Sequence, residues 1–190
     1  MARRRTWGIP LAAALAAATL LPVGPFALDP AQSRLEFRVR DNRGGFTGVA
    51  PRLRVRATVE ERDGAFAADV EAEVDARAIT TGLALRDAQM RGVFLQTDRF
   101  PTITFRGVAR PTDRVSALAF PVALRGELTI RDVTQPVEIP LRVTALADHY
   151  LAEGRLTIRL SAFGIPIPRF LVFRAEDPIE IIIRVRLVRP

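Results

Sequence analysis

Most of the chain alternates apolar and polar residues with a period of two, and this pattern constrains the fold more than any other feature. Over residues 34–40, Leu35, Phe37 and Val39 fall on one side and charged residues on the other. The same alternation recurs over residues 52–59, 66–75, 102–105, 122–130, 137–143, 156–160 and 179–187. Successive side chains of a β-strand point to opposite faces, so each run predicts a strand with one apolar face, giving about eight strands.

The polar faces of these runs predict how the strands are arranged. One run carries three arginines, at 52, 54 and 56, and the next carries Asp69, Glu71, Glu73 and Asp75. Opposite charges on neighbouring antiparallel strands can form cross-strand ion pairs. Because one face of the sheet meets water and the other must meet itself, we expect an all-β fold, with an antiparallel barrel favoured over a sandwich.

Residues 80–98 break the strand pattern. Leu83, Met90 and Phe94 have helix-compatible spacing, while Gly92 argues against a long regular helix. We therefore predict one short helix or helical lid across an opening of the barrel, and we call residues 82–95 the lid segment. Candidate residues of the lid and the barrel mouth are Leu83, Arg86, Met90, Arg91 and Phe94.

The N-terminus has the order of parts of a secretory signal. Arg3, Arg4 and Arg5 precede an apolar run at residues 9–21, which is shorter than the 20 or so residues that span a membrane. We predict a signal peptide over residues 1–25 and one domain over residues 26–190. An uncleaved membrane anchor is the alternative, and Ala16 with Ala18 is an early match to a cleavage site.

Few groups in the chain are suited to catalysis or metal binding. There is no cysteine and one histidine, His149, which lies in a turn-like stretch where we expect a solvent-facing loop. The sequence lacks a G-x-S-x-G elbow, a phosphate loop and a dinucleotide fingerprint. It also lacks a clustered basic stripe with aromatics, so we expect no nucleic-acid partner. These observations predict a binding protein with no catalytic residues, metal or cofactor; an enzyme built on His149 and Tyr150 is the weakest alternative.

Four segments, in order, resemble the YceI-like family of bacterial periplasmic proteins. They are FALDPAQSRLEFRV, GGFTGVAPRLRV, AITTGLALRDAQMRGVFLQTDRFPTITFRG and GELTIRDVTQPVEIPLRV, and the resemblance runs from about Phe26 to Val188. It implies a lipocalin-like barrel that binds a polyisoprenoid lipid in the periplasm. Gln32 and Gln89 stand where the family usually has histidines, so no role of those histidines is carried over.

The residues themselves leave open whether the barrel interior is packed or hollow. An eight-stranded barrel is either filled by side chains or holds one small ligand, and the inward positions mix large residues with Ala57, Ala68, Ala72 and Gly126. If it is hollow, we expect the lumen to be lined by Phe37, Phe66, Ile103, Phe105, Leu124, Leu128 and Ile158.

Two functions follow from these two interiors. A hollow barrel would carry an isoprenoid lipid, such as a polyprenyl chain or a quinone. A packed barrel would be a scaffold whose charged rims bind a membrane surface or an inner-membrane, cytochrome-like partner. The sequence leaves open whether the protein forms a homodimer.

Overall fold

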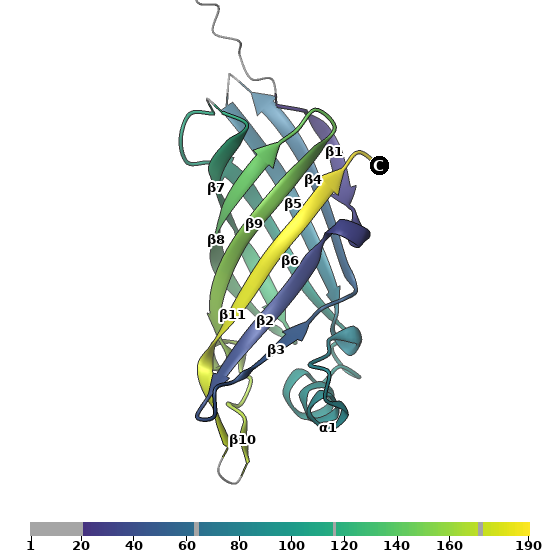
Figure 1. Cartoon of the computed structure of the whole chain (residues 1–190), viewed down its shortest axis with the longest axis vertical. Coiled ribbons are helices and arrows are strands. Elements are labelled where there is room, and N and C mark those ends of the chain that lie inside the picture. The colour runs from purple at the N-terminus through teal and green to yellow at the C-terminus, as the bar shows by residue number, and fades with distance from the viewer. Residues whose placement is uncertain (1–20, 63–64, 116, 171–172) are drawn as a thin grey trace, which may run out of the picture.

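A computed structural model describes residues 21–62, 65–115, 117–170 and 173–190 as one elongated β-barrel (Figure 1). Most of the predicted signal peptide lies outside the described residues. The strands are β1 (Gly24–Leu28), β2 (Arg34–Asp41), β3 (Phe46–Val49), β4 (Leu53–Arg62), β5 (Ala65–Asp75), β6 (Thr102–Pro111), β7 (Ala119–Ile130), β8 (Val133–Ala145), β9 (His149–Arg159), β10 (Arg169–Phe170) and β11 (Phe173–Val188). The helices are η1 (Pro30–Gln32), η2 (Ala76–Ala78), α1 (Ala84–Gln89), η3 (Met90–Leu95) and η4 (Leu160–Phe163).

The sheet closes on itself through the pairing of β1 with β11. The path β1-β4-β5-β6-β7-β8-β9-β11 contains eight strands, every pair is antiparallel, and Ala27 opposite Val188 completes the ring. β2 continues along β11 beyond β1, with Phe37 opposite Ile181, and β3 pairs with β2. The prediction of an all-β barrel of about eight strands is therefore confirmed. The remaining strands add no further member to the ring, because β2 and β3 extend the sheet beside β11 and β10 pairs only with β11.

The predicted charge pairing between neighbouring strands is confirmed. In the register of β4 and β5, Arg54 lies opposite Glu73, with 4.0 Å between their charged groups. Arg52 Nη1 donates to Asp75 Oδ2 at 3.1 Å. Glu71 turns to the other neighbour, β6, where Arg106 lies at 3.6 Å. Exposed pairs of this kind contribute little stability, so their effect is to favour one register and keep the outer face soluble.

The hairpin of β7 and β8 has a tighter turn than the sequence suggests. The alternating runs at residues 122–130 and 137–143 leave residues 131–136 for the turn, but β8 already begins at Val133. Arg131 adopts the left-handed conformation that a two-residue turn requires, with φ of 61°. The polar residues that follow belong to the strand, because Thr134 and Thr129 join their hydroxyl groups across the ladder at 2.8 Å.

The two ends of the barrel differ. At one, which we call the lid end, lie α1 on one side and the β2–β3 turn and β10 on the other (Figure 1). The predicted short helix is confirmed: α1 continues as the π-helical stretch η3, which ends at Leu95, and its C-cap Gln96 has a φ of 50°. At the other, which we call the far end, lie the C-terminus and the β8–β9 turn (Figure 1). None of the helices in the described ranges is long and apolar enough to cross a membrane.

Candidate functional site

The barrel encloses a cavity of about 610 Å³. The inward residues of the strands line it, and nearly all of them are apolar. The seven residues expected at the lumen all contribute to the lining: Phe37, Phe66, Ile103, Phe105, Leu124, Leu128 and Ile158. The interior is therefore hollow rather than fully packed, and Ala57, Ala68 and Ala72 line it where larger side chains would fill it.

The expected set omits part of the lining. Ile179, Ile181 and Ile183 of β11 face the cavity, and the alternation of this strand would have identified them. Tyr150 and Leu21 also line it, but their positions follow from contacts between distant segments. The polar residues among the lining are few: Glu36, Arg86, Gln89, Thr104 and Tyr150.

Aromatic and aliphatic side chains pack across the far end of the cavity. The Tyr150 ring meets Phe26 edge to face, with centroids 5.0 Å apart, and its hydroxyl donates to the Pro22 carbonyl at 2.6 Å. Burial raises the pKa of Tyr150 to about 12, against the opposing charge of Arg189. Leu21 is buried in the same cluster. Leu21 and Pro22, within the predicted signal peptide, thus contact the barrel.

At the lid end of the cavity, the buried carboxylate of Asp87 holds the lid segment in place. Asp87 is 5% exposed and accepts three hydrogen bonds, from Thr80 Oγ1 at 2.6 Å, Thr81 Oγ1 at 2.6 Å and the Thr81 amide at 2.8 Å. Burial would raise the pKa of Asp87, but these bonds and the charge of Arg91 outweigh it, so the pKa lies below its usual 3.8. Thr80 in turn pairs with Val49 of β3 as an isolated β-bridge, which ties the lid segment to the barrel.

The two arginines predicted at the mouth lie in different environments. Arg86 lines the cavity, donates to the Thr81 hydroxyl at 2.8 Å, and stacks 3.9 Å over the centroid of the Phe46 ring. Arg91 lies outside the cavity lining, and it donates to the backbone carbonyls of Asp87 and Arg77 at 3.2 and 3.0 Å. Of the other residues predicted for the lid and mouth, Leu83, Met90 and Phe94 line the cavity.

The arrangement of His149 and Tyr150 does not suit joint catalysis. Adjacent residues of a strand point to opposite faces, so the histidine faces outward while the tyrosine faces the lumen. The expectation of a loop histidine is wrong, because His149 begins β9, is partly buried, and has its Nδ1 2.6 Å from Asp148 Oδ1. This bond to His149 lowers the pKa of the Asp148 carboxyl. Within the described ranges, no three or more histidines and carboxylates gather as a metal site would require.

The sequence profile of the YceI-like domain matches residues 26–187, which is most of the chain. The chain belongs to the YceI-like family. A comparison with curated protein sequences finds no match.

Solved structures share this YceI-like barrel at low sequence identity. BcnA of Burkholderia cenocepacia is 18% identical, with a TM-score of 0.69 over 84% of this chain and 98% of that one. A polyisoprenoid binding domain from Saccharophagus degradans is 15% identical, with a TM-score of 0.69 over 89% and 100%. The YCEI protein of Campylobacter jejuni is 16% identical, with a TM-score of 0.55 over 72% and 81%. At these identities the comparisons establish the fold.

Proposed function

We propose that this YceI-like barrel is an exported carrier that holds one isoprenoid-type lipid in its lumen. The observation that carries the proposal is the 610 Å³ cavity with its almost wholly apolar lining. Its volume falls in the range of about 300 to 1,000 Å³ typical of sites for one small ligand. The fold shared with the polyisoprenoid binding domain of Saccharophagus degradans supports the same class of ligand.

The physical chemistry of such a ligand favours exchange with a bilayer. Burying one methylene stabilises a complex by about 0.8 kcal/mol relative to water, so a long prenyl chain would exceed the practical affinity limit of about 20 kcal/mol. Its real competitor is therefore the membrane, where the chain is equally well solvated. The balance then depends on headgroup contacts and on the ease of opening the barrel.

We place the headgroup at the lid end, beside Arg86 and Gln89. These two residues are the polar part of the cavity lining that the lid segment supplies. The Arg86 guanidinium carries five N–H donors, and the described bonds to Thr81 use two of them. Replacing Arg86 by alanine should change which lipid headgroup is retained, whereas Arg91→Ala should leave headgroup preference unchanged because Arg91 lies outside the lining.

Native mass spectrometry of the protein purified without detergent tests the carrier function, followed by organic extraction of any bound mass. A prenyl-type lipid in the extract is the expected result. A clean apo mass that persists after incubation with lipid vesicles would contradict the proposal. It would favour the alternative of a scaffold whose charged rims bind a membrane or cytochrome-like partner.

A matched pair of variants links the bound mass to the lumen. Ala72→Phe adds a ring inside the cavity, and we expect it to lower lipid occupancy strongly. Ala123→Phe adds the same volume on β7 at a position outside the cavity lining, and we expect it to keep the wild-type occupancy. Equal occupancy of the two variants would mean that the lipid binds elsewhere.

We also propose export to the periplasm through the N-terminal signal. The arginines before the apolar run and the periplasmic character of the family support this. Because Leu21 and Pro22 pack against the barrel, we further propose that the leader ends before Leu21. Fractionation of cells that produce the tagged full-length chain should then find it in the periplasm, and retention in the cytoplasm would contradict the proposal.

A further inference from the structure

The lid segment has the reverse of the usual polarity of a surface helix. A helix on a protein surface normally turns charged residues to water and apolar residues inward. Here the exposed residues of α1 and η3 are all uncharged: Ala84, Leu85, Ala88, Gln89, Gly92 and Val93. The charged residues of the same stretch are buried or partly buried, and Asp87, Arg86 and Arg91 bond to protein groups.

The exposed positions form one stripe that includes large aliphatic side chains. They recur in pairs every four residues, which fits a helix that relaxes from α to π winding. Leu85 is 71% exposed and Val93 56%, and Leu83, just before α1, is 53% exposed. Leu83 and Leu85 also line the cavity, so this apolar stripe borders the mouth through which a ligand would pass.

The same end of the barrel carries most of the net positive charge. From residue 21 on, the chain has 25 arginines and 21 carboxylates. The segments that form the lid end, residues 40–45, 76–101, 131–132, 160–170 and 173–177, carry nine arginines and six carboxylates. Three of the four net positive charges therefore lie there.

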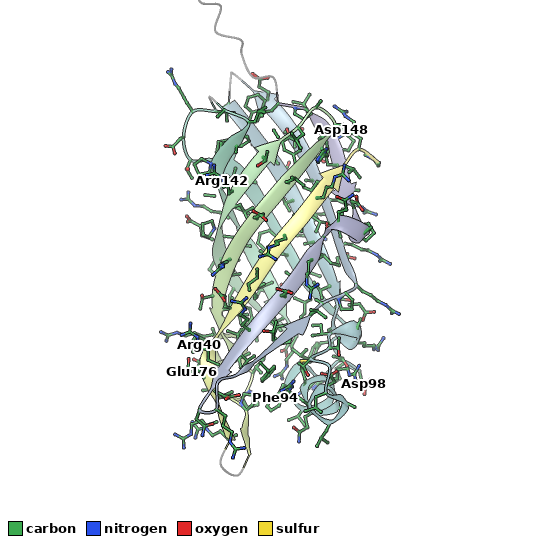
Figure 2. The ribbon with its side chains drawn as sticks, in the orientation of Figure 1. Arg40, Phe94, Asp98, Arg142, Asp148 and Glu176 are labelled. Atoms are coloured by element: carbon green, nitrogen blue, oxygen red, sulfur yellow. The ribbon has the colours of Figure 1, made fainter. Side chains whose placement is uncertain are left out.

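Contacts between these segments show that they share one end. The Arg86 guanidinium stacks on Phe46, beside the β2–β3 turn. The Asn42 amide donates to the Arg174 carbonyl at 3.2 Å, and Arg131 Nη1 donates to the Gly164 carbonyl at 3.1 Å. Figure 2 likewise has Arg40, Phe94 and Asp98 toward this end, and Arg142 and Asp148 toward the other.

We propose that the lid end docks on an anionic lipid bilayer, with Leu83, Leu85 and Val93 inserted among the headgroups and arginines around them contacting lipid phosphates. An uncharged apolar face at an end of the barrel with net positive charge fits docking on an anionic membrane surface. The inference deepens the proposed function and rests on it for its purpose, since docking in this orientation would bring the cavity mouth against the membrane that supplies the lipid.

Vesicle flotation of the full chain, purified as the folded protein, tests the docking. The probes are vesicles of phosphatidylcholine alone and of phosphatidylcholine mixed with phosphatidylglycerol. Three net charges near an anionic surface should strengthen binding about 100-fold over neutral vesicles. Raising the salt from 0.1 to 1 M shortens the screening length from about 10 to about 3 Å and should remove most of this preference.

Two chemically matched double variants locate the contact. Leu83→Gln with Leu85→Gln changes the lid end, and Leu118→Gln with Leu151→Gln makes the same change at exposed leucines outside it. Each inserted leucine contributes about tenfold or more in affinity. The first pair removes two such leucines and should therefore weaken binding to the anionic vesicles about 100-fold, while the second pair keeps the wild-type value. The melting temperatures of both variants check that they remain folded.

The outcomes separate docking from the carrier function. Wild-type protein that holds lipid by native mass spectrometry yet never floats with anionic vesicles overturns the docking and leaves the carrier function standing. Equal losses in the two double variants also overturn it. A dimer in solution that the Leu83→Gln, Leu85→Gln pair dissociates overturns it in favour of a second copy of the chain on this face. Protein that floats as predicted but holds no lipid supports docking and counts against the carrier function.

Discussion

Replacing Asp87 by alanine is predicted to release the lid segment while the barrel stays folded. The carboxylate is 5% exposed and accepts three hydrogen bonds, at 2.6, 2.6 and 2.8 Å, from Thr80 and Thr81. It is the main polar link between α1 and the stretch that pairs with β3. The strand ladders of the barrel do not depend on it, so the effect should be local.

The magnitude follows from the number and type of these bonds. A hydrogen bond to a charged group contributes about 1.5 to 3 kcal/mol, so three bonds at the low end of that range amount to about 4.5 kcal/mol. This corresponds to an increase of about 2,000-fold in the equilibrium constant for opening the lid segment. Asp87→Asn keeps the shape and neutral hydrogen bonds of about 1 kcal/mol each, so we expect a loss of about 1.5 kcal/mol, a third of the effect.

Amide hydrogen exchange measures this opening directly. The informative amides are those of Asp87 and Thr97, which donate to the carbonyls of Leu83 and Arg91 at 2.9 Å each. We expect their exchange to accelerate by up to about 2,000-fold in Asp87→Ala, with the β7–β8 amides unchanged. Asp98→Ala is the matched control, because it removes an exposed carboxylate just beyond the helix.

Acid should reproduce the effect of the substitution in the wild type. The folded-state pKa of Asp87 lies below 3.8, so its contribution to lid stability is present at neutral pH and is lost as the pH falls below 3.8 through the folded-state value. Unchanged exchange in Asp87→Ala would refute the reasoning. So would exchange that rises equally in lid and barrel, because the lid segment would then not open on its own.

Three further predictions concern the far end, the strand packing and the leader. The pKa of about 12 for Tyr150 predicts that the absorbance shift of this single tyrosine occurs well above pH 10. The contribution of the buried phenol to stability is complete below pH 10 and is lost as the pH rises towards 12. An absorbance transition near pH 10 in the folded protein would contradict this prediction. Gly107→Ala should lower the melting temperature sharply, since an added Cβ would lie 2.4 Å from the Arg125 carbonyl oxygen. In the control variant Gly92→Ala the added Cβ meets open space within a helix, so this variant should be neutral or more stable by up to about 1 kcal/mol. Equal melting temperatures of the two variants would contradict this prediction. If the leader ends before Leu21, the intact mass of exported protein should fit cleavage after Ala18, and a mature chain that begins beyond Pro22 would contradict it.

Local patterns in the sequence determined the strands and much of the lumen. The side-chain period of two is a property of the single strand, so alternation alone identified the inward residues Phe37, Phe105 and Ile158 before any pairing was known. Outward charges predicted ion pairs between these two neighbouring strands for a similar reason, because antiparallel strands place such residues opposite each other, and the structure supplied the specific pair of Arg54 with Glu73. Helical spacing likewise identified the lid segment, although not its change of winding.

Contacts between residues far apart in the chain were decided only by the tertiary structure. The hydrogen bond from Tyr150 to Pro22 joins residues 128 positions apart, and no local pattern indicates it. The arginines look scattered along the sequence, yet barrel closure brings Arg43, Arg174 and their neighbours to one end. The exposure of Leu85 is also a tertiary property: helical periodicity separates the faces of the lid segment, but the attachment of Asp87 decides which face turns outward. The periodicity of apolar residues describes one helix or strand at a time, whereas which residues meet at one end of the barrel depends on how all the strands and helices are connected and paired.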